Sequence, residues 1–178
     1  DGPPQSNNIA HAFVLTRPGR AKVYYDGNNI EGNNWTHFPK PGRYDALGQG
    51  DDYVTRILDA RKRFGRGNLV NRWVNSNLFI YERQVGGKGV LLVGLNDRGD
   101  VGGSMTQQVQ TAFAPGQLLQ DLSGQQPNVV VGADSKVTIT VPANSTSGNS
   151  NNARGYVLYA PYSPQALSGI DPVQFADA

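Results

Sequence analysis

Two segments in the first third of the chain space their apolar residues as a helix does. In residues 9–14 these residues recur three and four positions apart, and the Pro-Gly pair that follows predicts the end of the helix. In residues 53–64 the same spacing recurs after a pair of aspartates that suits a helix start. Between the helices, the β-branched and aromatic residues of 21–25 predict a short strand, and residues 26–50, rich in Gly, Asn and Pro, predict one long loop.

After residue 69 the apolar residues change to the alternating spacing of β-strands. Gly86 and Gly87 separate two such runs, 78–81 and 90–93, and predict a β-hairpin with a loop of several residues. The remaining strand candidates are residues 109–113, 118–119, 129–131, 137–141 and 156–159. Short strands joined by turns of Gly, Asn and Pro are typical of an antiparallel β-sandwich. We therefore predict a mainly β fold.

These patterns divide the chain into a helical part at residues 1–66, a β-sandwich at 67–160 and a tail or linker at 161–178. The helix–strand–helix order of the first part indicates a fragment of a βα-repeat fold, since one such unit leaves both edges of its strand open. The apolar residues of the first helix and of the strand at 21–25 must therefore find other burial. We expect that strand to pair with a second copy of the chain; packing onto the sandwich and fraying are the alternatives.

The composition excludes several kinds of site. The 178 residues include no cysteine, which rules out disulfides, thiolate metal sites and cysteine nucleophiles. His11 and His37 are too far apart in the sequence to form a paired-histidine metal site on one helix, so we predict no metal and no cofactor. No apolar run approaches the roughly 20 residues of a membrane-spanning helix. The net charge is +2 and the basic residues are scattered except at 61–63, so we predict neither a membrane nor a nucleic-acid partner.

The sequence AHAFVLTRPG at residues 10–19, followed by VYY at 23–25, resembles a segment of the α-amylase family, family 13 of the glycoside hydrolases. In that family the segment reads AxAFxLTRPGxxxVYY and carries the end of the seventh helix and the eighth strand of a (β/α)8 barrel. Residues 52–64 resemble the eighth helix, and the strands after residue 69 resemble the C-terminal β-sandwich. The resemblance implies an antiparallel Greek-key β-sandwich preceded by a helix–strand–helix remnant of the barrel, over residues 1–160.

The resemblance also implies an α-glucan partner and a retaining hydrolase, whose two catalytic carboxyl groups lie about 5 Å apart. In the family these groups belong to barrel strands four and five, which would precede Asp1. We therefore expect this chain to be non-catalytic by itself, with the missing barrel portion as a further partner. A third family acid steadies the substrate at the end of strand seven. Asp1 is that acid, its immediate neighbour, or a residue without a role.

The long loop would follow the last barrel strand, at the end of a barrel where active sites lie. Trp35, His37 and Tyr44 belong to that loop, and aromatic faces can stack on sugar rings. Tyr25 and Asp26, at the end of the predicted strand, are further candidate sugar contacts. For both groups the alternative is structural: anchoring of the loop, and a hydrogen-bonded pair.

The sequence leaves three functions open. The chain is the non-catalytic end of an α-glucan hydrolase, a free-standing carbohydrate-binding module, or a small glycosidase with a newly built site at Asp26 and Glu31. Its content of Asn, Gly, Ser and Thr suits a secreted or periplasmic protein of bacteria. Two further predictions concern single residues: Trp73 packs beneath the sandwich, and Glu82 lies on a solvated strand face.

Overall fold

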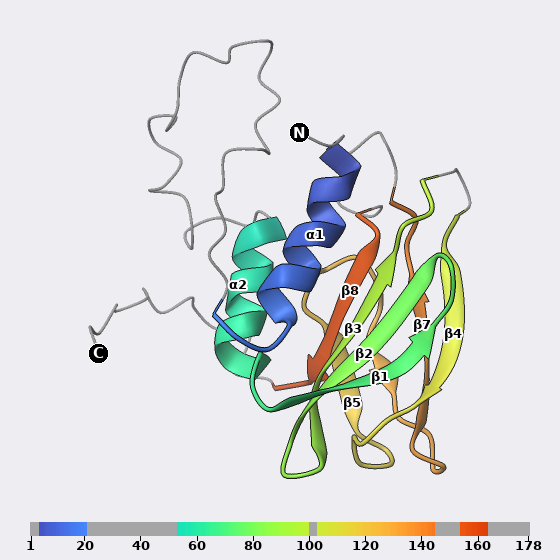
Figure 1. Cartoon of the computed structure of the whole chain (residues 1–178). Coiled ribbons are helices and arrows are strands. Elements are labelled where there is room, and N and C mark those ends of the chain that lie inside the picture. The colour runs from blue at the N-terminus through green and yellow to red at the C-terminus, as the bar shows by residue number, and fades with distance from the viewer. Residues whose placement is uncertain (1–3, 21–52, 100–102, 145–153, 164–178) are drawn as a thin grey trace.

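The computed structural model describes residues 4–20, 53–99, 103–144 and 154–163 of the chain. These residues form two helices and eight strands (Figure 1). The helices are α1 (Pro4–Thr16) and α2 (Tyr53–Phe64); the strands are β1 (Asn68–Val74), β2 (Leu78–Val85), β3 (Lys88–Asn96), β4 (Met105–Gln110), β5 (Leu118–Asp121), β6 (Val129–Val130), β7 (Lys136–Val141) and β8 (Tyr156–Pro161). The strand predicted at 21–25 lies outside the described residues. No helix in the described part is long and apolar enough to cross a bilayer.

Six strands form one antiparallel sheet in the order β1-β2-β3-β8-β5-β6, and β4 pairs with β7 in a second sheet. The hairpin predicted around Gly86 and Gly87 is confirmed, and it joins β2 to β3. Its predicted loop of several residues is wrong: Val85 pairs with Lys88, so the turn consists of the two glycines, and both have a positive φ. β8 lies between β3 and β5, so the chain returns to the middle of the large sheet only after it has built β4 to β7. The mainly β fold is confirmed.

Both faces of the six-stranded sheet are buried. On β8, Tyr156 and Leu158 belong to an apolar cluster that the sheet shares with the two helices. The alternate residues Val157 and Tyr159 belong to a second cluster, shared with β4 and β7. Because successive side chains of a strand point to opposite faces, the molecule has three layers. The helices cover one face of the large sheet and the two-stranded sheet covers the other (Figure 1).

The apolar stripe of each helix lies against the large sheet. Ala12, Leu15 and Ile57 are at most 4% exposed and belong to the same cluster as the residues of β2, β3 and β8. Of the three outcomes considered for the helical part, the structure therefore shows packing onto the sandwich for both helices. Pairing of residues 21–25 with a second copy concerns residues that the structure does not describe, and it stays a prediction.

Two arginines hold the C-terminal end of α1 in place. Arg83, buried in β2, donates hydrogen bonds to the carbonyl oxygens of Thr16 at 2.6 Å and Gly67 at 2.7 Å. Arg61 of α2 donates to the carbonyl oxygen of Leu15. The last carbonyl groups of a helix lack partners within the helix and carry a partial negative charge. The two guanidinium groups supply both the missing donors and the opposite charge.

A hydroxyl pair joins the same end of α1 to the sheet. The Thr16 hydroxyl donates to the carbonyl oxygen of Ala12 at 2.5 Å. A hydroxyl has only one hydrogen, so Tyr81 of β2 is the donor in the hydrogen bond that it shares with Thr16. Burial raises the pKa of Tyr81 well above its ordinary value, which keeps that donor protonated. The threonine of the LTRPG segment therefore ends α1 and also fastens it to β2.

Two predictions for single residues are wrong. Trp73 is 38% exposed on the edge strand β1 and does not pack beneath the sandwich. Glu82 is fully buried, and its Oε2 lies 2.5 Å from Nη2 of Arg72 in an ion pair. Both errors have one origin, because the strand candidates did not include β1. That strand carries Trp73 on the edge of the sheet and brings Arg72 to Glu82.

Candidate functional site

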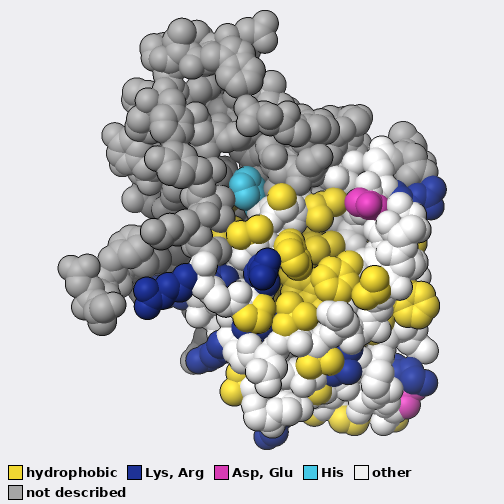
Figure 2. Space-filling view, viewed as in Figure 1, with side chains coloured by type: hydrophobic (Ala, Val, Ile, Leu, Met, Phe, Trp, Pro, Cys, Tyr) yellow, Lys and Arg dark blue, Asp and Glu magenta, His cyan; other side chains and the backbone are white. Residues whose placement is uncertain are grey.

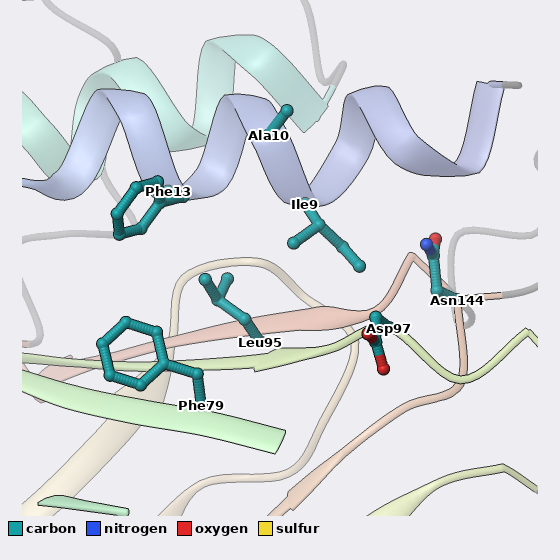
Figure 3. Close-up of a pocket in the computed structure, with 7 residues that line it drawn as sticks. All are labelled: Ile9, Ala10, Phe13, Phe79, Leu95, Asp97 and Asn144. Atoms are coloured by element: carbon teal, nitrogen blue, oxygen red, sulfur yellow. The ribbon is translucent and has the colours of Figure 1, made fainter. Parts of the chain in front are cut away.

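A cleft of about 480 Å³ lies between α1 and the neighbouring strands β2 and β3 (Figure 3). It is a shallow depression that is open to solvent over much of its extent. Its lining consists of Ile9, Ala10, Phe13, Phe79, Leu95, Asp97 and Asn144. Figure 3 shows the two phenylalanines at one end of the cleft and the two polar side chains at the other. Hydrophobic side chains gather in the middle of the same face of the molecule (Figure 2).

Aromatic rings form the apolar end of the cleft. The ring centroids of Phe13 and Phe79 lie 6.3 Å apart, with an angle of 57° between the planes. The Tyr81 ring packs against both. Its centroid lies 6.2 Å from that of Phe13, in an edge-on arrangement, and 5.0 Å from that of Phe79. Tyr81 is fully buried, whereas both phenylalanines are half-buried. Phe13 and Phe79 therefore keep apolar surface that a ligand can contact.

Backbone contacts hold the polar end. Asp97 follows β3 and is exposed; its Oδ1 accepts a hydrogen bond from Nδ2 of Asn77 at 2.9 Å. The Asp97 N–H also donates to the carbonyl oxygen of Asn77 at 3.0 Å. Two hydrogen bonds, one between side chains and one between backbone groups, therefore join the two residues. Asn144, 5% exposed, donates its backbone N–H to the carbonyl oxygen of Arg98 at 2.7 Å. A carboxylate and an amide thus meet at the end of β3.

A buried asparagine joins the backbone segments at the polar end of the cleft. Asn96 is fully buried, and its Nδ2 donates to the carbonyl oxygens of Gly103 at 2.7 Å and Pro142 at 3.0 Å. Its Oδ1 accepts the N–H of Arg98 at 3.1 Å. Gly155 packs against it with φ 69°, and a Cβ there would lie 2.6 Å from the Asn96 carbonyl oxygen. The position therefore requires glycine.

The buried carboxylates that the structure describes lie away from the cleft and have structural partners. Glu82 pairs with Arg72 and accepts the Ala112 N–H at 3.0 Å. Burial raises the pKa of Asp121, and the hydrogen bonds that it accepts act in the opposite direction. On α1, burial lowers the pKa of His11. No group of three His, Asp or Glu residues in the described part could hold a metal ion.

The structure does not test the sugar contacts predicted from the sequence. The residues Asp1, Tyr25, Asp26, Trp35, His37 and Tyr44 lie outside the described ranges, so their roles stay predictions. The sequence does not predict the cleft, because the spacing of Phe13 indicates only the buried stripe of a helix. A signal was present at Phe79, which lies between two apolar residues in β2. In a strand this pattern makes both faces apolar, which indicates a second covering layer.

The cleft can bind a molecule with an apolar face and hydroxyl groups. Phe13 and Phe79 present apolar surface to one part of such a ligand. Asp97 can accept hydrogen bonds, and the Asn144 side chain is an amide, which can donate and accept. A pyranose ring has C–H groups that pack on aromatic rings and hydroxyls that bind such polar groups. Among the described residues that line the cleft, Asp97 is the carboxylate.

Comparison with solved structures finds the same fold in three kinds of enzyme. A γ-CGTase from Alkalophilic bacillus clarkii matches 91% of this chain with a TM-score of 0.58 and 19% identity. An α-amylase from Geobacillus thermoleovorans, solved with acarbose, matches 92% with a TM-score of 0.59 and 13% identity. A debranching enzyme from Nostoc punctiforme matches 88% with a TM-score of 0.55 and 16% identity. No protein-family model and no curated protein matches the sequence.

These matches cover only part of each enzyme. The chain spans 24% of the γ-CGTase, 34% of the α-amylase and 31% of the debranching enzyme. At such low identity the likeness concerns the fold. The shared fold confirms the resemblance to the α-amylase family that residues 10–25 indicate. The chain therefore has the fold of one part, about a quarter to a third, of an α-amylase-type enzyme.

Proposed function

We propose that this chain is the non-catalytic end of an α-amylase-family glycoside hydrolase and that it binds α-glucan. The observation that carries the proposal is the shared fold over 88–92% of the chain. In this proposal residues 1–66 are the end of a barrel, and the strands form a Greek-key sandwich. The enzyme would be secreted or periplasmic in a bacterium, and Asp1, Tyr25, Asp26, Trp35, His37 and Tyr44 would lie toward the substrate.

The surroundings of the described carboxylates support a non-catalytic role. A retaining glycosidase needs two carboxyl groups about 5 Å apart on either side of the scissile bond. Both buried carboxylates have structural partners. Of the exposed ones, Asp59 pairs with Arg63, and Asp134 with Lys136, while Asp97 accepts a hydrogen bond from an asparagine. The described part therefore offers single acceptors for ligand hydroxyls rather than a catalytic pair.

The purified chain is expected to leave starch, maltooligosaccharides and aryl maltosides unhydrolysed above background. A single general acid contributes about 10²–10⁴-fold, far below the enhancements of about 10⁶-fold or more that enzymes reach. Release of reducing ends and of the aryl group measures this directly. Turnover that disappears in a Glu31→Gln variant would contradict the proposal and favour the small glycosidase.

The cleft is expected to contribute to binding of maltooligosaccharides. Replacing Asp97 by Ala removes an exposed acceptor, and a hydrogen bond to a charged group contributes about 1.5–3 kcal/mol. We expect the affinity for maltoheptaose in calorimetric titration to fall about tenfold, at the lower end of that range because Asp97 is exposed.

The matched control is Asp134→Ala, which removes an exposed carboxylate from the turn before β7. It changes the net charge equally but lies outside the cleft lining, so it should bind like the unaltered chain. Equal affinities of both variants would show that the cleft takes no part in binding.

A further inference from the structure

The floor of the cleft continues beyond its lining toward the edge of the large sheet. Leu95 of β3 pairs with Phe79 of β2, and Phe79 pairs in turn with Val74 at the end of β1. Residues directly opposite each other on antiparallel strands point to the same face. All three side chains therefore lie on the face that the helices cover. We call this set of three the floor row.

The exposure of the floor row rises toward the edge of the sheet. Leu95 is 6% exposed, Phe79 is half-buried and Val74 is 63% exposed. Figure 3 shows the cause at the inner end, where Ile9 and Phe13 point from α1 toward Leu95 and Phe79. At the outer end, β1 is an edge strand of the described sheet. The cleft thus has α1 as a wall on one side and opens on the other side over Val74.

The position of Val74 places it within reach of a ligand in the cleft. Neighbouring strands lie about 4.8 Å apart, which is less than the width of a pyranose ring with its hydroxyl groups. A sugar ring that lies on Phe79 therefore extends over Val74 as well. The C–H groups of such a ring can pack on both side chains, while Asp97 and Asn144 remain at the polar end of the cleft.

A polypeptide strand fits this edge less well than a ligand held by side chains. An added strand would pair with the free backbone groups of an edge strand. The pairing of β1 with β2 shifts its register between Asn71 and Trp73, and only Trp73 and Val74 of β1 follow that shift. A bulge interrupts the regular pattern of backbone hydrogen bonds. Two residues beyond a bulge are too few to hold another strand beside the cleft.

We propose that the cleft binds an internal segment of an α-glucan and that Val74 is part of the surface that this segment contacts. The choice of glucan rests on the proposed function, whereas the choice of an internal segment rests on the open side of the cleft. An enclosed pocket admits a polymer only by its end. A site with a wall on one side receives a chain laterally, so neither end of the chain has to enter it.

The first test compares ligands with and without chain ends. The full chain is titrated calorimetrically with maltoheptaose, with β-cyclodextrin and with a long maltodextrin of defined length. The two smaller ligands hold the same number of glucose units, but the cyclic one has no end. We expect both to bind, and we expect several protein molecules to bind each long chain. Recognition of an end would instead give one protein molecule per long chain and no binding of β-cyclodextrin.

The second test changes Val74 in two directions. Val74→Thr keeps the shape of the side chain and replaces a methyl group by a hydroxyl, and we expect it to weaken maltoheptaose binding about threefold. Val74→Tyr places an aromatic ring beside Phe79, and we expect it to tighten binding about fivefold. β-strands accept both residues well. Tighter binding by the second variant cannot result from a loss of fold.

The matched controls are Val85→Thr and Val85→Tyr. Val85 is 45% exposed at the end of β2 and lies outside the cleft lining. We expect both controls to bind maltoheptaose like the unaltered chain. Light scattering of Val74→Tyr should give the same mass as the unaltered chain.

The outcomes separate this inference from the proposed function. If none of the three glucans binds, the proposed function fails and the inference fails with it. If one protein molecule binds each long chain, or if β-cyclodextrin does not bind, the proposed function stands and the internal segment is wrong. Equal affinities of the Val74 and Val85 variants overturn the place of Val74 in the binding surface. Self-association of Val74→Tyr overturns it too, because the surface would then bind a second copy of the chain.

Discussion

Replacing Asp121 by Asn is expected to lower the free energy of unfolding by about 3–5 kcal/mol. Asp121 is 5% exposed at the end of β5. Its Oδ1 accepts the N–H groups of Ser123 and Leu158, both at 3.0 Å. Its Oδ2 accepts the Ser123 hydroxyl at 2.7 Å and the N–H groups of Gln125 and Gln126, both at 2.9 Å.

An amide cannot accept at both positions, so the NH2 group that the substitution introduces must face two or three of these donors. Each buried donor left without an acceptor costs about 1–3 kcal/mol, which is a large share of a total stability of about 5–15 kcal/mol. Urea denaturation followed by circular dichroism measures the change. The matched control is Asp134→Asn, which alters an exposed carboxylate and should leave the midpoint near that of the unaltered chain. Similar midpoints for both variants would show that the donors around Asp121 find other partners.

Replacing Glu82 by Gln is expected to cost about 2–4 kcal/mol, because it leaves Arg72 without its opposite charge. Glu82 is fully buried, and Nε and Nη2 of Arg72 lie 2.6 and 2.5 Å from its Oε2. Removing one partner of a buried pair usually costs about 3–5 kcal/mol. The Arg72 side chain is 16% exposed and can reach some water, which shifts the expected cost about 1 kcal/mol below that range.

A double variant separates the ion pair from the packing around it. Glu82→Gln combined with Arg72→Met removes both charges, and we expect it to be more stable than Glu82→Gln alone. Chemical denaturation of the single and double variants gives the coupling energy. A double variant as unstable as the sum of the two single variants would show that the pair contributes nothing as a pair.

The helices and most of the strands could be predicted because their signal is local. Apolar spacing predicted α1 and α2, and the double glycine predicted the β2–β3 hairpin. β1 escaped prediction because its seven residues include two asparagines and an arginine. Its place depends on pairing with β2, from which it differs in composition, and such pairing has no signal within seven residues.

The cleft could not be predicted because its lining comes from four separate stretches of chain. Phe13 lies on α1, Phe79 on β2, and Asp97 and Asn144 beyond the ends of β3 and β7. Periodicity indicated which residues would be buried but not which helix would meet which strand.

The sequence by itself determined the two helices, the antiparallel strands and the likeness to α-amylase-type enzymes, because helix and strand periods and the LTRPG segment are properties of contiguous residues. Only the tertiary structure decided that the helices cover one face of the large sheet while β4 and β7 cover the other. It also decided that Glu82 is buried with Arg72 and that Trp73 is exposed. The physical reason is the same in each case. Burial and charge pairing depend on which distant segment covers a residue, and that is settled by packing among all the layers at once.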